Sequence, residues 1–262
     1  LLQKFERGQA MDIKVVVAAH KACAMPGDGL YLPVQAGAAI NKPIDGFTPD
    51  NSGDNISEKN PGFCELTCLY WAWKNLDADY IGLAHYRRHF SLDGKHPLTL
   101  KQAEKLIESN DIILPKKRKY YIETLYSHYS HTLDAAPLDE AGAVISEKYP
   151  EYLPAFERLK KRTSAHMFNM LIMKKELLSG YCEWLFGVLF ELEKRVDTTA
   201  LDSFNARFYG RVSELLLDVW LETNGLDCKE IGFIYTEKVN RFKKVIGFLS
   251  AKFLGKKYGK SF

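Results

Sequence analysis

The chain has 262 residues, of which 46% are hydrophobic and 26% are charged, and its net charge is +3. This length suffices for a full hydrophobic core, and the balanced composition excludes collagen, a coiled coil and wholesale disorder. The longest apolar runs, such as 13–19 and 215–221, are shorter than the roughly 20 residues that a membrane-spanning helix requires. The five cysteines are an odd number without CxxC spacing, which favours reduced thiols in a cytoplasmic protein over disulfides or a zinc site.

The two ends of the chain differ from its body. Residues 1–10 have mixed charge and precede Met11, so we interpret them as a leader or an expression remnant. Residues 238–262 hold eight bases and no acid, with apolar residues near helical spacing, which predicts a basic amphipathic helix. Such a helix either lies on an anionic membrane surface or docks on the core. Residues 11–237 form one predicted domain, and its lack of a basic field argues against nucleic acid as a partner.

Hydrophobic periodicity predicts the elements in chain order. The continuous apolar run at 12–19 is typical of a strand buried on both faces of a parallel sheet. Residues 26–62 are rich in Gly, Pro, Asn and Asp and are predicted to form a long loop, as is the tyrosine-rich segment 116–136. Helices are predicted at 63–75, 100–109, 139–149, 151–162, 175–195 and 203–224, and strands at 79–84, 111–114, 166–173 and 230–235. This order predicts an α/β fold with a mostly parallel sheet flanked by helices.

Basic residues follow three of the predicted strands directly. Ligands of open α/β sheets bind beyond the carboxyl ends of the strands, so these groups are expected to converge on one edge. Such an edge suits an anionic ligand, although both Gly-rich phosphate motifs, GxxxxGK[ST] and GxGxxG, are absent. The alternative is that the arginines pair with surface carboxylates. The groups are His20 and Lys21, His85-Tyr86-Arg87-Arg88, and Lys116 and Lys117.

Three segments together resemble a known family. The runs CELTCLYWAWKN at 64–75, DYIGLAHYRRHF at 79–90 and HMFNMLIMKKELLSGYCEWLF at 166–186 resemble capsular and exopolysaccharide glycosyltransferases long labelled only as a domain of unknown function, a group that includes galactofuranosyltransferases. The resemblance extends from residue 11 to about residue 235. It implies a GT-A-like, Rossmann-like fold and transfer of a hexose from a UDP-sugar to a lipid-linked saccharide. A lipid-linked acceptor in turn implies an enzyme at the inner face of the plasma membrane.

The leaving diphosphate of such a reaction must be neutralised by a metal or by fixed cations. Many GT-A enzymes use a DxD motif, but Asp77-Ala78-Asp79 precedes its strand and is interpreted as a turn. The cationic HYRR run stands where DxD would be expected, so a metal-independent reaction is predicted, with Mn or Mg as the alternative. The residues predicted to bind the donor are His20, Lys21, His85, Tyr86, Arg87 and Arg88.

An inverting transferase also needs a base that takes the proton of the acceptor hydroxyl. The catalytic candidates are Glu214, Asp134 and His85, with Glu65 as a further plausible acid. The alternative is a structural role for Glu214 and Glu65, since acidic side chains near the start of a helix are stabilised by the helix dipole.

Four residues are predicted to bind the acceptor: His128, His131, His166 and Asn169. In a regular strand His166 and Asn169 would point to opposite faces, so at least one of them is expected to be structural. The pair His128-x-x-His131 is interpreted as a saccharide contact in preference to metal ligands.

Two other functions remain open at this point. The chain could be a non-catalytic module that binds a nucleotide sugar or a polysaccharide at the membrane. It could also hydrolyse phosphoesters with its histidines, which would require a metal.

Overall fold

The computed structural model describes residues 11–199 and 201–237, so the predicted leader and basic tail lie outside the described residues. An eight-stranded sheet forms the centre, in the order β3-β2-β1-β4-β5-β10-β6-β9, with a further pairing of β9 on β4. Its strands are β1 (Ile13–Ala19), β2 (Tyr31–Gln35), β3 (Thr48–Pro49), β4 (Tyr80–His85), β5 (Arg88–Ser91), β6 (Ile112–Pro115), β9 (Leu171–Lys174) and β10 (Lys229–Tyr235). A separate pair joins β7 (Arg118–Lys119) to β8 (Ser164–Ala165).

The prediction of a mostly parallel sheet is wrong, because the sheet is mixed. Strands β2 and β4 run parallel to β1, and β3 is parallel to β2. Strand β9 is antiparallel to both β4 and β6, and β5 is antiparallel to β4 and β10. The sequence predicts no strand at 88–91, where β5 follows β4 after only two residues. A connection that short reverses the chain, since parallel neighbours need a long crossover.

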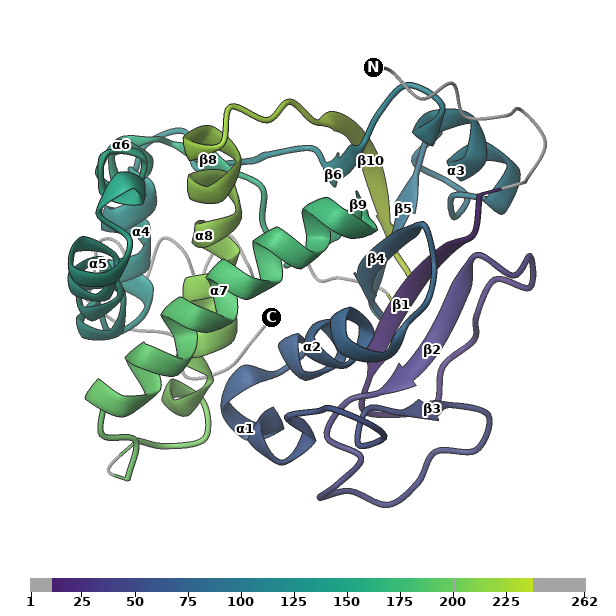
Figure 1. Cartoon of the computed structure of the whole chain (residues 1–262), viewed down its shortest axis with the longest axis horizontal. Helices are drawn as coiled ribbons and strands as arrows, with labels where there is room; N and C mark the ends of the chain where they lie inside the picture. Colours follow the sequence, from purple (N-terminus) through teal and green to yellow (C-terminus); the bar gives the residue numbers. More distant parts are fainter. Residues whose placement is uncertain (1–10, 200, 238–262) are drawn as a thin grey trace.

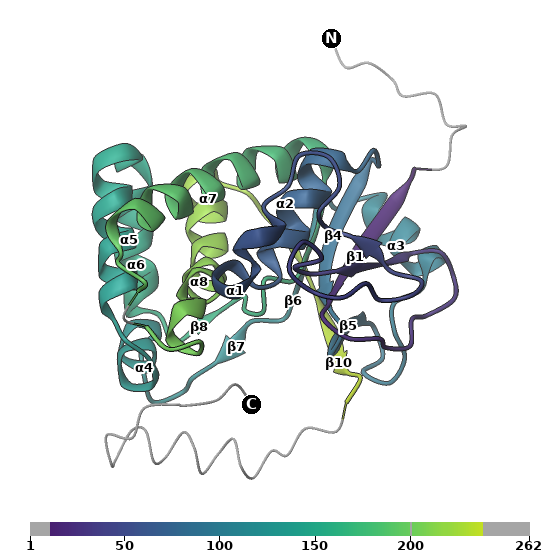
Figure 2. The same ribbon diagram turned by 90° about the horizontal axis from the view of Figure 1, so that it is seen from below.

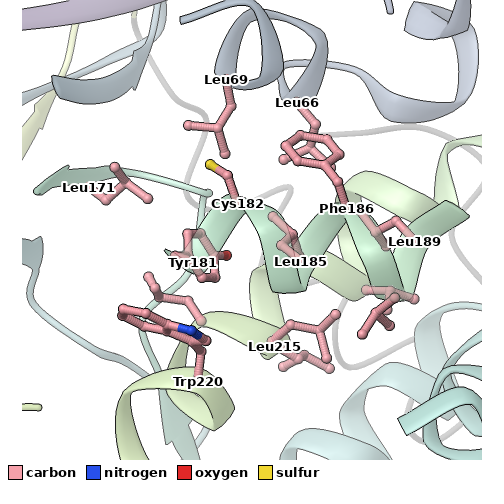
Figure 3. Packing of buried hydrophobic residues seen from close by; sticks show 14 of the residues in the cluster. Leu66, Leu69, Leu171, Tyr181, Cys182, Leu185, Phe186, Leu189, Leu215 and Trp220 are labelled. Atoms are coloured by element: carbon pink, nitrogen blue, oxygen red, sulfur yellow. The ribbon is translucent and has the colours of Figure 1, made fainter. Parts of the chain in front are cut away.

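Helices cover both faces of the sheet (Figure 1). On one face lie α2 (Leu66–Asn75), α7 (Lys175–Arg195) and α8 (Phe208–Thr223), and their apolar side chains pack together in the main core (Figure 3). The opposite face packs against α3 (Leu100–Ile107), which begins with a capping box of Thr99 and Gln102. The remaining helices are α1 (Asn60–Phe63), α4 (Leu125–Thr132), α5 (Ala136–Lys148) and α6 (Leu153–Lys161). Helices α4 to α6 gather at the end of the molecule away from β2 and β3 (Figures 1 and 2).

Three predicted segments differ from the structure. The predicted loop 26–62 contains β2, β3 and α1, and the buried Asp50 fixes it by accepting hydrogen bonds from the Gly37 and Ala38 N–H groups and from the Ser57 and Thr67 hydroxyls. The predicted loop 116–136 contains α4. The predicted strand at 166–173 is regular only from residue 171.

No helix within 11–199 and 201–237 combines the length and the apolarity needed to cross a bilayer.

Candidate active site

The turn between β4 and β5 consists of Tyr86 and Arg87, the centre of the HYRR run. The Arg87 N–H donates to His85 Nδ1 at 3.1 Å across the turn. Thr236, which directly follows β10, fixes the other side, because its hydroxyl donates to the Tyr86 carbonyl at 2.6 Å and its N–H donates to the Arg87 carbonyl at 3.0 Å. The turn is therefore rigidly placed at the carboxyl end of β4.

The side chain of Tyr86 is buried, and three neighbouring basic residues lie around its ring. Its ring meets His20 edge to face at a centroid distance of 5.0 Å, and Lys21 Nζ and Arg87 Cζ lie 5.1 and 5.2 Å from the ring centroid. Since Ala18 of β1 pairs with His85 of β4, the ends of these parallel strands lie side by side. The predicted convergence of the groups after β1 and β4 is confirmed. Part of this charge is compensated, because Glu237 lies 2.7 Å from Lys21 and 3.4 Å from Arg87.

The surroundings of His85 are cationic. Burial and the charges of Arg88, Arg87, His20 and Arg207 together lower the pKa of His85 to about 3. Its imidazole is therefore neutral near pH 7. Burial and nearby cations also lower the pKa of His20. Arg207, which immediately precedes α8, belongs to this cluster, although no motif in the sequence indicates it.

Arg88 points toward the aromatic residues beside β10. Its guanidinium lies 4.2 Å from the Phe168 ring centroid and 5.5 Å from that of Tyr235. Its Nε is buried and, within the described residues, has no hydrogen-bond partner. The same holds for one terminal nitrogen of Arg211 on α8. Buried donors without partners are costly, and an anionic group that accepts from them removes this cost.

Two carboxylates lie close to these arginines. Burial and the negative charge of Glu65 raise the pKa of Glu214 to about 7, against the opposing charges of Arg88 and Arg118. Glu65 accepts a hydrogen bond of 2.8 Å from the Asn169 amide, whose oxygen in turn accepts from the Ser213 hydroxyl at 2.9 Å. A carboxyl group with a pKa near neutrality can exchange protons at working pH.

The backbone around this site is strained at three residues. Cys64, Phe168 and Asn169 have φ values of 53°, 77° and 53°, a region that favours glycine. The strain at Phe168 and Asn169 ends the strand pattern and turns the Asn169 side chain toward Glu65 and α8. Cys64 Sγ accepts a hydrogen bond of 3.1 Å from Arg207 Nε. Strain of this kind accumulates where a structure must hold functional groups in place.

The other predicted site residues have different surroundings. Asp134 is exposed and accepts from the Ala136 N–H at 3.1 Å, which is a local turn. His128 and His131 both lie on α4, and their Nδ1 atoms are 3.1 and 2.8 Å from the carboxylate of the buried Glu123. These two histidines therefore form one cluster with Glu123 instead of extending into a loop.

His166 forms a buried ion pair with Asp218. Burial alone lowers the pKa of His166, but the hydrogen bonds and charges of Asp218 and Cys228 together outweigh burial and raise this pKa to about 9. The second ring nitrogen lies 3.1 Å from Glu230. Because both ring nitrogens face protein carboxylates, the geometry gives His166 a structural role rather than a saccharide contact.

The remaining basic and acidic motifs lie apart from the turn. Lys116 is exposed, and the charge of Lys117 helps to lower the pKa of Asp218. The charges that lower the pKa of His85 come from Arg88, Arg87, His20 and Arg207, so the predicted third group is not among them. Asp77 pairs with Lys175 at 2.7 Å, and Asp79 accepts from the Asp12 N–H at 2.8 Å. Both aspartates precede β4, at its amino end, as the turn interpretation expects.

Comparison with known proteins shows the family of this chain. It belongs to the family described as Domain of unknown function (DUF4422), whose model matches residues 14–225. Its fold is similar to the apo structure of the bifunctional glycosyltransferase WbbM, with a TM-score of 0.80 and 30% identity over 87% of this chain and 46% of that one. The chain thus spans about half the length of that protein. No curated protein matches the sequence.

Proposed function

We propose that the chain is a GT-A-like glycosyltransferase domain that transfers a hexose, with galactofuranose as one candidate, from a UDP-sugar to a lipid-linked saccharide in capsular or exopolysaccharide synthesis. The similarity to a bifunctional glycosyltransferase supports glycosyl transfer in general. The observation that carries the proposal is the cationic turn at the end of β4, beside a carboxyl group of raised pKa. Buried nitrogens of Arg88 and, from α8, of Arg211 lack hydrogen-bond partners in the described structure.

The cationic cluster suits the diphosphate of the donor. Arg87, Arg88 and Arg207 surround a neutral His85. Because its Nδ1 accepts from the Arg87 N–H, its Nε2–H can donate one hydrogen bond without adding charge. Guanidinium groups bind phosphate oxygens with paired hydrogen bonds, and they stabilise the negative charge that develops on the leaving diphosphate.

The residues at the turn do not fit a divalent cation. Mg²⁺ and Mn²⁺ prefer oxygen ligands, whereas the groups that face the turn are guanidinium, imidazole and ammonium. The carboxylate of Glu237, which lies beside the turn, pairs with Lys21 and Arg87. This supports the proposal of a donor site in which side-chain cations act without a metal.

The reaction also requires a base, and the carboxylates of Glu214 and Glu65 are placed to supply it. Glu214 lies within electrostatic reach of Arg88, so it adjoins the proposed diphosphate site. In an inverting reaction its carboxylate takes the proton of the attacking hydroxyl while the bond between the anomeric carbon and the diphosphate breaks. Asn169 positions Glu65 beside it. The exposed, locally bonded Asp134 is a weaker candidate for this role.

The donor site is tested by thermal shift with UDP, UDP-hexoses and other nucleotides, with added manganese and with excess chelator. Arg88→Ala is compared with Arg158→Ala, because Arg158 is an exposed arginine on α6 that pairs with Glu222. A ligand that binds the native state raises the unfolding midpoint. We expect stabilisation by uridine diphosphate compounds without metal, lost only in Arg88→Ala. Absence of stabilisation by every nucleotide contradicts the donor site.

The alternative, a non-catalytic binding module, predicts the same thermal shifts without turnover. The discriminating assay follows release of UDP and transfer of labelled sugar to membrane extracts that contain lipid-linked saccharides. Undiminished transfer after exhaustive chelation is the outcome expected for a metal-independent enzyme. Binding without any transfer to the acceptors offered favours the module.

A further inference from the structure

Residues 116–122, between β6 and α4, combine four bases with exposed apolar side chains. The segment reads Lys-Lys-Arg-Lys-Tyr-Tyr-Ile and contains no acid. Its strand β7 and the following helix α4 run along the lower side of the molecule in Figure 2, the side toward which the end of β10 also points. We refer to these residues as the 116–122 loop.

The apolar tip of this loop is unusually exposed. Tyr121 is 82% exposed and Ile122 is 60% exposed, the two highest values among the large hydrophobic residues of the described structure. They are adjacent in the chain, so they form one apolar tip rather than scattered contacts with water. Adjacent exposed hydrophobic residues ringed by polar ones mark an interaction surface.

The backbone holds Tyr121 outward at the expense of strain. Tyr121 has a φ of 53°, and the Ile122 N–H donates to the Tyr120 carbonyl at 2.6 Å, which closes a tight turn around it. The residues on either side are anchored: Tyr120 is buried and donates its N–H to the Thr163 carbonyl, and Glu123 is buried beside two histidines. A strained turn that exposes an aromatic ring points to a function for that ring.

The charge of the loop is positive. Lys116, Arg118 and Lys119 are exposed, and within the described part of the chain none of the four bases forms an ion pair. An apolar tip beside exposed bases is complementary to an anionic bilayer, where apolar side chains enter the interface and bases contact the lipid phosphates. Tyrosine is suited to the interface between the lipid headgroups and the acyl chains, because its ring is apolar and its hydroxyl is polar.

The loop also borders the candidate active site. The positive charge of Arg118 lowers the pKa of Glu214, and Arg118 packs over the Tyr120 ring at 4.9 Å. A surface that binds the 116–122 loop therefore lies close to the carboxylates of the site.

We propose that the 116–122 loop is a membrane-docking element that inserts Tyr121 and Ile122 into the interface of an anionic bilayer. This contact lies within the folded domain and is separate from the predicted basic tail. It goes beyond the proposed function, since docking requires no catalysis, and it would place the candidate site next to the lipid surface.

The experiment measures co-sedimentation of the full chain with vesicles of phosphatidylcholine alone and of phosphatidylcholine with phosphatidylglycerol. We expect binding only to the anionic vesicles. Tyr121→Ser/Ile122→Ser should weaken it at least about tenfold because the buried apolar area is lost. Lys116→Gln/Lys119→Gln should weaken it about fivefold per charge. The matched controls, Leu92→Ser and Lys101→Gln/Lys105→Gln, change similarly exposed residues near or on α3 and should bind as the parent does.

A second measurement separates insertion of the loop from binding by the tail. Tyr121→Trp and the control Leu92→Trp are titrated with vesicles of lipids brominated in the acyl chain, and the emission of the parent chain is subtracted. We expect quenching only in Tyr121→Trp. Vesicle binding without quenching at position 121, or unchanged affinity of Tyr121→Ser/Ile122→Ser, overturns the proposal. The thermal shift with UDP is recorded for the same variants and should be unchanged, so failure of docking is distinguishable from failure of the donor site.

Discussion

The substitution Glu214→Gln should stabilise the folded chain above neutral pH while it abolishes turnover. The pKa of Glu214 is raised from 4.5 to about 7, chiefly by burial and then by the charge of Glu65. Between these two values the folded state binds more protons than the unfolded state, so stability falls as the pH rises. The raised pKa corresponds to roughly 3 kcal/mol of lost stability above pH 7, at about 1.4 kcal/mol per pKa unit. The neutral amide avoids this loss and still accepts the backbone hydrogen bond from Phe168.

The assay is thermal unfolding of the parent and of Glu214→Gln from pH 4.5 to pH 8. For a chain of this size about 3 kcal/mol corresponds to a rise in Tm of roughly 6 to 12 °C at pH 8, which should shrink to nothing near pH 4.5. Turnover of the parent should increase through pH 7, because a base with this pKa is about one tenth ionised at pH 6 and about nine tenths at pH 8. A Gln variant that is no more stable than the parent at pH 8, or that retains turnover, would refute the reasoning.

Three further substitutions test the structure around the site. Asp218→Asn leaves His166 without its buried partner and should lower the free energy of unfolding in urea by about 3 kcal/mol. The pKa of His166 in the folded state is about 9. The stability that this pair supplies to the parent is therefore complete below pH 6.5 and should be lost as the pH rises through 9. Gly82→Ala places a methyl group 2.8 Å from the Leu171 carbonyl oxygen and should destabilise by about 1–3 kcal/mol, with Gly27→Ala, in open space, as the control for Tm. Arg207→Ala should weaken binding of uridine diphosphate by roughly tenfold or more in calorimetry, and unchanged affinity would remove Arg207 from the donor site.

The elements that the sequence predicts well are those whose burial pattern is strong by itself. The run at 12–19 corresponds to β1, and the predicted helix at 175–195 coincides with α7, because long periodic or continuously apolar segments leave few alternatives. The sequence does not indicate strand β2, because the strand contains Pro33 and lies between Gly-rich turns. Its pairing with β1 and the hydrogen bonds of Asp50 fix it, and both are contacts between distant residues that periodicity does not register.

In the candidate site too, some residues follow from local sequence patterns and others are placed by contacts between distant segments. The convergence of His20 with the HYRR turn follows from one rule about the carboxyl ends of neighbouring parallel strands. Arg207 and Arg211 come from the start of α8, more than a hundred residues further along the chain, and no local pattern assigns them to the turn. The available signal is their spacing, since residues 211 and 214 are three apart and therefore share one side of α8, and Arg207 is the N-cap residue of this helix.

The strained residues explain why the part of the site around Glu65 and Asn169 is harder to predict than the cationic turn. An alternating strand at 166–173 would place His166 and Asn169 on opposite faces, and this expectation assumes a regular backbone. Positive φ values at Phe168 and Asn169 break the alternation, so that Asn169 reaches Glu65 and Ser213 while Phe168 packs under Arg88. The same strained pair thus contacts both the carboxylates and the cationic turn. If donor and base act together, this short irregular segment is what fixes their separation, and a regular strand in its place would disconnect them.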